Sequence, residues 1–141
     1  MSLARYLVDT SALVRLLRSE QVLARWEQQI TAGLVAVCPI VELELLYTAR
    51  SKADRDELVN LLRAAFGWVA MPERVFDRGS EIQAALTARG THRSAGAVDL
   101  LIAATADLHT LVLLHYDRDF DRVGEVTGQP TQWLADAGSL P

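Results

Sequence analysis

Short apolar segments alternate with longer helical patterns along the chain, and this alternation constrains the fold more than any other feature. The segments expected to form strands are 5–8, 34–37, 67–69 and 111–114, with 130–131 as a candidate fifth. Apolar residues recur at helical spacing between them, which predicts helices at about 10–19, 21–31, 39–50, 51–66, 73–89, 98–109 and 117–125. Such alternation is typical of a parallel sheet whose two faces are covered by helices, so we predict an α/β fold.

Local signals set several of these boundaries. Gly33 is expected to end one helix and Pro39 to occupy the first position of the next. Ser51 is expected to cap the helix that follows, with Asp54 three residues on as a weaker version of the capping box.

The 141 residues suit one domain with one core, and no repeat, low-complexity segment or linker divides them. We therefore expect a single domain over 1–141. No apolar run approaches the ~20 residues that cross a bilayer, and the N-terminus lacks the form of a signal peptide. The single cysteine, Cys38, fits a reducing compartment, so we expect a cytoplasmic protein.

The net charge of −4 argues against a protein that is held on nucleic acid mainly by its overall field. It does not exclude a nuclease, because bound divalent cations reverse the local sign of an acidic site.

Three acidic residues share one position relative to the predicted sheet. Asp9 directly follows the first strand, Asp117 follows the strand at 111–114, and Asp99 begins the helix that precedes that strand. In an open α/β fold the carboxyl ends of strands and the amino ends of the helices lie on the same edge, where ligands bind near the switch in strand order. We expect the three carboxylates to converge there.

A fourth candidate lies in the helix at 39–50, which contains Glu42 and Glu44. Both lie among apolar residues on a helical wheel, and the wheel favours Glu44 only slightly. An unpaired buried carboxylate costs several kcal/mol, so one of the two calls for an explanation.

Each acid also has an ordinary explanation when it is considered alone. Asp9 and Asp99 could stabilise helix N-termini, and the acids of the stretch YDRDFDR at 116–122 could form a solvated, salt-bridged helix start. Thr10 and Ser11 are expected to cap the helix or to orient Asp9, because no spaced histidine supports a nucleophile. The combination favours a different interpretation: four carboxylates from separate elements suit Mg²⁺ or Mn²⁺, and a metal-bound water can attack a phosphodiester.

Four stretches, YLVDTSAL (6–13), VELELLYTAR (41–50), VDLLIAATA (98–106) and HYDRDF (115–120), together resemble a PIN-domain ribonuclease, and more closely a VapC-type toxin of a toxin–antitoxin pair. The resemblance covers nearly the whole chain. It implies an α/β/α sandwich with a central parallel sheet of four or five short strands. It also implies a Mg²⁺- or Mn²⁺-dependent endoribonuclease that hydrolyses RNA phosphodiester bonds with a metal-activated water.

The resemblance also implies roles for individual residues. The catalytic acids would be Asp9, Glu44, Asp99 and Asp117, of which Asp9, Asp99 and Asp117 would bind the metal. The supporting residues would be Thr10, Ser11, Asp119 and His115.

His115 is a departure from the family pattern, because many relatives have threonine two residues before the fourth acid. This leaves open whether Asp117 or Asp119 takes the fourth role. It also leaves open whether His115 tunes metal affinity or contacts a phosphate. The loop near Asp99 offers Arg89 and Arg93 as contacts to substrate phosphate.

Relatives of this type imply partners as well. We expect a homodimer and a small VapB-like antitoxin, with a heterotetramer or larger assembly of the two. The antitoxin's C-terminal segment would lie over the acidic site and present a cation to it. The helices at 10–31 and 39–65 are expected to supply the groove for this partner.

Other classes fit less well. A phospho-accepting receiver domain would need a lysine near a late strand, and Lys52 is the only lysine. A haloacid-dehalogenase-type phosphatase would need an aspartate two residues after Asp9, where Ser11 stands. A catalytically inactive PIN-like module that binds RNA or protein remains the alternative.

Overall fold

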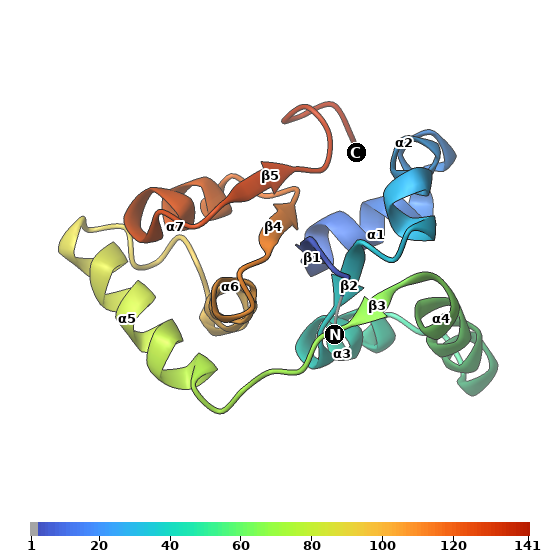
Figure 1. The fold of residues 1–141 in the computed structure, drawn as a ribbon, viewed down its shortest axis with the longest axis horizontal. Coiled ribbons are helices and arrows are strands. Elements are labelled where there is room, and N and C mark those ends of the chain that lie inside the picture. The colour runs from blue at the N-terminus through green and yellow to red at the C-terminus, as the bar shows by residue number, and fades with distance from the viewer. Residues whose placement is uncertain (1–2) are drawn as a thin grey trace.

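Five parallel strands form the centre of the fold (Figure 1). The computed structural model describes residues 3–141, so the first two residues of the predicted domain lie outside it. The strands are β1 (Tyr6–Val8), β2 (Val35–Val37), β3 (Gly67–Trp68), β4 (Val112–His115) and β5 (Thr131–Trp133). They pair in the order β3-β2-β1-β4-β5, and every neighbouring pair is parallel. The predicted α/β class and the candidate fifth strand are confirmed.

Helices cover both faces of this sheet. They are α1 (Thr10–Arg18), α2 (Glu20–Thr31), α3 (Pro39–Tyr47), α4 (Lys52–Ala65), α5 (Val75–Ala88), α6 (Ala97–Leu108) and α7 (Asp119–Thr127). In Figure 1 α5, α6 and α7 lie to the left of the strands, and α1, α2 and α4 lie to their right. The expected sandwich is therefore confirmed, and predicted element ends differ from the observed ones by at most three residues.

The local signals act largely as predicted. Gly33 follows the C-cap of α2 with a φ of +78°, a backbone conformation that glycine adopts without steric cost. Pro39 is the first residue of α3, and the Ser51 hydroxyl accepts a hydrogen bond from Asp54 N at 3.1 Å. The Asp54 carboxylate, however, accepts from Arg50 N at 2.9 Å, one residue before the position that a capping box requires.

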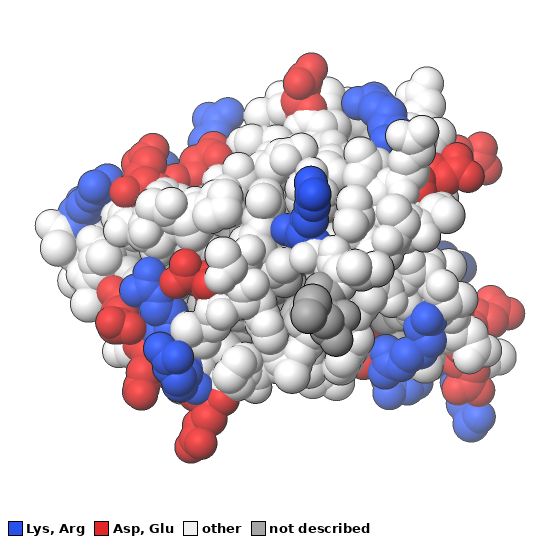
Figure 2. Space-filling view, in the orientation of Figure 1, with Lys and Arg blue, Asp and Glu red and all other residues white. Residues whose placement is uncertain are grey.

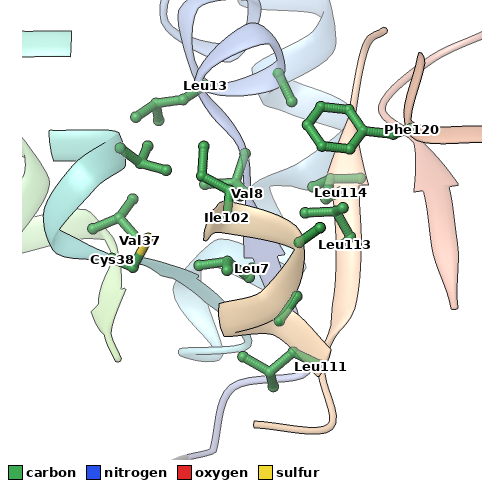
Figure 3. Close-up of a cluster of buried hydrophobic side chains, with 14 of the residues drawn as sticks. Leu7, Val8, Leu13, Val37, Cys38, Ile102, Leu111, Leu113, Leu114 and Phe120 are labelled. Carbon is green, nitrogen blue, oxygen red and sulfur yellow. The ribbon is translucent and has the colours of Figure 1, made fainter. Parts of the chain in front are cut away.

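The core is built where the two central strands meet the helical layers. Figure 3 shows Leu7 and Val8 of β1 with Leu113 and Leu114 of β4, close to Ile102 of α6. All five side chains have no exposed surface. Central strands of a parallel sheet are covered on both faces, which is why these two strands are apolar without alternation.

The strand order places a switch point between β1 and β4. From β1 the chain adds β2 and then β3 on one side, and it then crosses to add β4 and β5 on the other side. The connections that leave β1 and β4 therefore diverge, and open α/β sheets bind ligands in the crevice between such ends. Asp9 and Asp117 follow these two strands directly or within two residues.

The face drawn in Figure 2 carries no broad basic patch. On the face drawn in Figure 2, acidic and basic side chains are interspersed around a largely uncharged centre. Any attraction of this face for nucleic acid must therefore come from local contacts rather than from a continuous positive surface.

Among residues 3–141 no helix is long and apolar enough to cross a membrane.

Candidate active site

Asp9 lies between the end of β1 and the start of α1, and only 2% of its surface is exposed. Its Oδ1 accepts a hydrogen bond from Ala12 N at 2.9 Å, so it caps α1 as the ordinary interpretation predicted. The Ser11 hydroxyl lies 2.8 Å from each of its two carboxylate oxygens. Capping fixes this carboxylate at the switch point of the sheet, so the two explanations of Asp9 are compatible.

Burial makes the charged form of Asp9 costly. The pKa of Asp9 rises from 3.8 to about 6, chiefly because burial disfavours the charged form. The hydrogen bonds from Ala12 and Ser11 oppose this rise, and the charge of Asp99 adds to it. The donors that contact Asp9 are therefore too few to offset the loss of water, and a nearby cation would favour ionisation.

Ser11 joins the two central strands at this point. Its hydroxyl donates to Asp9 and accepts a hydrogen bond from Tyr116 N at 3.0 Å. Tyr116 is the first residue after β4. The predicted role of Ser11 in orienting Asp9 agrees with this geometry, whereas sequence reasoning missed Tyr116, since a backbone donor leaves no trace in residue type.

The structure separates the two glutamates of α3. Thr10 donates a hydrogen bond from Oγ1 to Glu44 Oε1 at 2.5 Å, which places Glu44 beside the residue that follows Asp9. Glu42 instead forms an ion pair with Arg63 of α4, with Nη1 2.7 Å from Oε1. Glu42 is therefore neutralised away from the switch point, and Glu44 is the glutamate that meets the other predicted residues.

Asp99 is the electrostatic centre of the predicted acids. It lies in the first turn of α6, half-buried, and its Oδ2 accepts from Gly96 N at 3.4 Å. The pKa of Asp99 is raised, first by burial and then by the charges of Asp117, Glu44 and Asp119. Since the charge of Asp99 also raises the pKa of Asp9, each of the other three predicted catalytic acids lies within electrostatic reach of Asp99. We call Asp9, Glu44, Asp99 and Asp117 the acidic cluster.

Asp117 and Asp119 differ in their partners. Asp117 was predicted to lie inside the last helix, but α7 begins only at Asp119, because Asp117 uses its own Oδ1 to accept from Asp119 N at 2.9 Å. Asp119 is paired with Arg122 at 2.9 Å. The pKa of Asp119 is nevertheless raised, by burial and then by the charge of Asp117. Arg122 is the only cation in an ion pair with any of these acids within residues 3–141.

The remaining predicted residues fare differently. His115 has no exposed surface, so the suggested contact with a substrate phosphate is wrong for this structure. Burial lowers the pKa of His115, against the opposing charges of Asp121 and Asp117. Arg89 is exposed, 3.7 Å from Glu125, and Arg93 is exposed in the loop before α6. Their contact with phosphate stays a prediction.

The donor set determines which metal the site can accept. Within residues 3–141, no three His, Cys, Asp or Glu side chains form a group that could hold a metal ion. Mg²⁺ does not require such a group, because it keeps several waters and uses one or two carboxylates together with substrate phosphate. The carboxylates of the acidic cluster fit a hydrated Mg²⁺ or Mn²⁺ and do not fit the nitrogen and sulfur preference of Zn²⁺.

Known proteins match the chain over most of its length. The family model described as "PIN domain" matches residues 6–126. Ribonuclease VapC21 of Mycobacterium tuberculosis is 42% identical over 135 residues, which are 96% of this chain and 97% of that protein. Ribonuclease VapC18 of the same organism is 38% identical over 137 residues, 96% of this chain and 98% of the relative.

Solved structures agree in fold at lower identity. The chain superposes with a TM-score of 0.75 on a chain of DNA-bound VapBC from Salmonella typhimurium, at 18% identity, covering 94% of this chain and 99% of the other. A chain of VapBC2 from Rickettsia felis, bound to a promoter fragment, gives 0.76 at 18% identity, with 91% and 97% covered. At such identities the likeness concerns the fold.

Proposed function

The chain belongs to the PIN domain family, in which its relatives are VapC ribonucleases, and from this premise we propose that it is a divalent-metal-dependent endoribonuclease and a toxin of the VapC type. The acidic cluster carries the proposal. Three carboxylates from other elements, those of Asp9, Glu44 and Asp117, lie within electrostatic reach of Asp99, and the buried Asp9 has a pKa of about 6. Such an excess of negative charge is costly to maintain for structure alone, and a divalent cation would remove the cost.

The residues divide into ligands and supporting groups. Asp9, Asp99 and Asp117 would hold a hydrated Mg²⁺ or Mn²⁺, one or two of them directly and the rest through its waters, and an RNA phosphate would complete the coordination. When bound, the metal supplies a Lewis acid that lowers the pKa of a water and neutralises the charge developing on the phosphate. Glu44, whose carboxylate accepts a hydrogen bond from Thr10, would take the proton of the attacking water. Ser11 keeps Asp9 in register with the end of β4.

We assign the fourth acidic role to Asp117 rather than Asp119. Asp119 is already paired with Arg122, whereas one carboxylate oxygen of Asp117, Oδ2, accepts no hydrogen bond from residues 3–141. The charge of Asp117 also raises the pKa of Asp99 more than the charge of Asp119 does.

We further propose that a cognate antitoxin holds the nuclease inactive, because the structural neighbours from Salmonella typhimurium and Rickettsia felis are VapBC complexes. A cation from such a partner would meet an acidic cluster that forms no ion pair within residues 3–141, where Arg122 pairs with the neighbouring Asp119. A groove of about 290 Å³ between α1, α3 and α4, with Leu17, Leu45 and Leu58 in its lining, supports the expected docking helices. A homodimer and a cytoplasmic location belong to the same proposal.

The direct test is cleavage of total RNA by the purified chain, freed of antitoxin, with Mg²⁺ or Mn²⁺ and with EDTA. Cleavage is expected only with the metal, and 5′-end sequencing of the fragments would identify the RNA. Asp99→Asn and Glu44→Gln are expected to lose at least about 100-fold in rate, because even residues that merely orient a metal ligand contribute 10- to 100-fold.

Glu42→Gln is the matched control. It removes the same charge from the same helix, two residues from Glu44, but its partner is Arg63 on the surface. This variant should cleave RNA like the original chain. RNA binding without metal-dependent cleavage would overturn the nuclease and favour the alternative, a catalytically inactive PIN-like module that binds RNA or protein. Equal losses in both glutamate variants would overturn the role of Glu44.

A further inference from the structure

His115 is a fully buried polar side chain next to the acidic cluster, and its ring nitrogens have distinct surroundings. It is the last residue of β4, and its ring lies between those of Phe120 and Trp133, with centroids 5.4 and 5.0 Å away. Nδ1 accepts a hydrogen bond from Asp117 N at 3.2 Å. A backbone N–H can only donate, so Nδ1 must carry a lone pair, and the ring proton of the neutral imidazole must be on Nε2.

The other side of the ring favours the same tautomer independently. Nε2 has no hydrogen-bond partner within residues 3–141, and its charged neighbour is Asp121, with Oδ1 at 3.8 Å. Asp121 is itself held by the indole of Trp133, whose Nε1 donates to the two carboxylate oxygens at 3.1 and 3.3 Å. A fixed carboxylate on this side attracts a proton on Nε2, and so leaves the lone pair on Nδ1.

Asp117 is consequently fixed at two points. Its backbone N–H is bound to His115, and its Oδ1 is bound to the backbone of Asp119. The first contact holds the main chain of Asp117 and the second holds its side chain, so together they restrict the direction of the carboxylate. Oδ2 accepts no hydrogen bond from residues 3–141, which leaves it available to a ligand.

We infer that His115 is a positioning residue for Asp117: its ring, with Asp121 beside Nε2, accepts the Asp117 N–H at Nδ1 and so holds the Asp117 carboxylate in the orientation that metal binding would require. The inference rests on the proposed function, because it needs Asp117 to bind the metal. Orienting groups behind a ligand set its geometry, and this one acts through the main chain of the ligand. An apolar side chain could fill the same space between Phe120 and Trp133, so packing alone does not require a buried imidazole.

Two amide substitutions separate positioning from packing. In His115→Asn the side-chain oxygen can take the place of Nδ1, whereas in His115→Gln the polar end lies one carbon further out, near Nε2, and the Nδ1 position is lost. The measurement is Mn²⁺ binding to the RNA-free protein, by titration calorimetry or by the loss of the free Mn²⁺ electron-paramagnetic-resonance signal. His115→Gln is expected to weaken binding about 10- to 100-fold, and His115→Asn is expected to stay close to the original affinity.

Two further readouts complete the test. In the metal-free original protein, long-range ¹H–¹⁵N spectra should show an unprotonated Nδ1, and the opposite tautomer would overturn the inference whether or not any variant folds. In RNA cleavage, His115→Gln should lower kcat with little change in KM. Equal Mn²⁺ affinity of the Asn and Gln variants, whether both low or both unchanged, would also overturn it.

Asp117→Asn separates this inference from the proposed function. If that variant binds Mn²⁺ as the original does, the assignment of Asp117 as a ligand fails, and the positioning role fails with it. If Asp117→Asn loses the metal while His115→Gln keeps it, only the positioning role is overturned.

Discussion

Replacing Asp9 with asparagine is expected to stabilise the metal-free protein at neutral pH and to leave its stability nearly unchanged in acid. The pKa of Asp9 in the folded protein is about 6, above its ordinary value of 3.8. The folded state therefore binds the proton more tightly than the unfolded state does, and ionisation costs stability. This cost is absent below about pH 3.8, grows as the pH rises toward 6, and is constant above that.

The size of the effect follows from the same two values. A shift from 3.8 to about 6 corresponds to about 3 kcal/mol at pH 7.5, at ~1.36 kcal/mol per unit. Linkage reduces this to about 1.6 kcal/mol at pH 5 and about 0.6 kcal/mol at pH 4. Asparagine is neutral at all three pH values and is also a good N-cap, so it can keep the bond from Ala12 N. If asparagine replaces the Ser11 contacts imperfectly, the gain in the free energy of unfolding would be about 1 kcal/mol smaller at every pH, and its dependence on pH would be the same.

The assay is urea unfolding in EDTA at pH 4, 5 and 7.5. Asp56→Asn is the control, since Asp56 is an exposed partner of Lys52, and such surface pairs contribute little. The difference in the free energy of unfolding between Asp9→Asn and the original protein should shrink steadily between pH 7.5 and 4. The corresponding difference for Asp56→Asn should not. An advantage that is the same at all three pH values would refute the argument that buried, uncompensated charge is stored at Asp9. Added Mn²⁺ should stabilise the original protein and not the variant.

Three further outcomes are expected. Ser11→Ala removes the hydroxyl from Asp9 and leaves Tyr116 N without its acceptor, so unfolding in urea should show a loss of about 1–3 kcal/mol. Thr110 lies just after the C-cap of α6, in the left-handed region at φ +57°, which is unfavourable for a β-branched residue. Thr110→Gly should therefore raise the free energy of unfolding by about 1 kcal/mol and the melting temperature by a few degrees, and an unchanged melting temperature would contradict this. Trp26→Phe should cost about 1 kcal/mol in the same unfolding assay, since the indole N–H donates to Leu134 O at 3.0 Å, and an unaffected variant would mean that water replaces this bond.

The fold was predictable because its signals are local. Apolar strands as short as Tyr6–Val8 stand out between helical patterns, and parallel topology then follows from general rules. One error lies where a side chain sets the boundary of an element through its own hydrogen bond. Asp117 delays the start of α7 by accepting from Asp119 N, which periodicity cannot reveal.

The candidate site was predictable in part for the same reason. Topology alone brings Asp9 and Asp117 to one edge of the sheet, since both follow central strands. A helical wheel could not decide between Glu42 and Glu44, because α3 is apolar nearly all round. It depends on contacts with Arg63 and Thr10, which are 21 and 34 residues away in the chain. The two possible roles of His115 stayed open for a similar reason, as its burial depends on Phe120 and Trp133.

The pairing of β1 with β4 joins the start of the chain to a strand that is synthesised more than a hundred residues later. Until then one edge of β1 is open, with its main-chain groups available to another strand, and this is the stage at which the growing polypeptide is most exposed to misassembly.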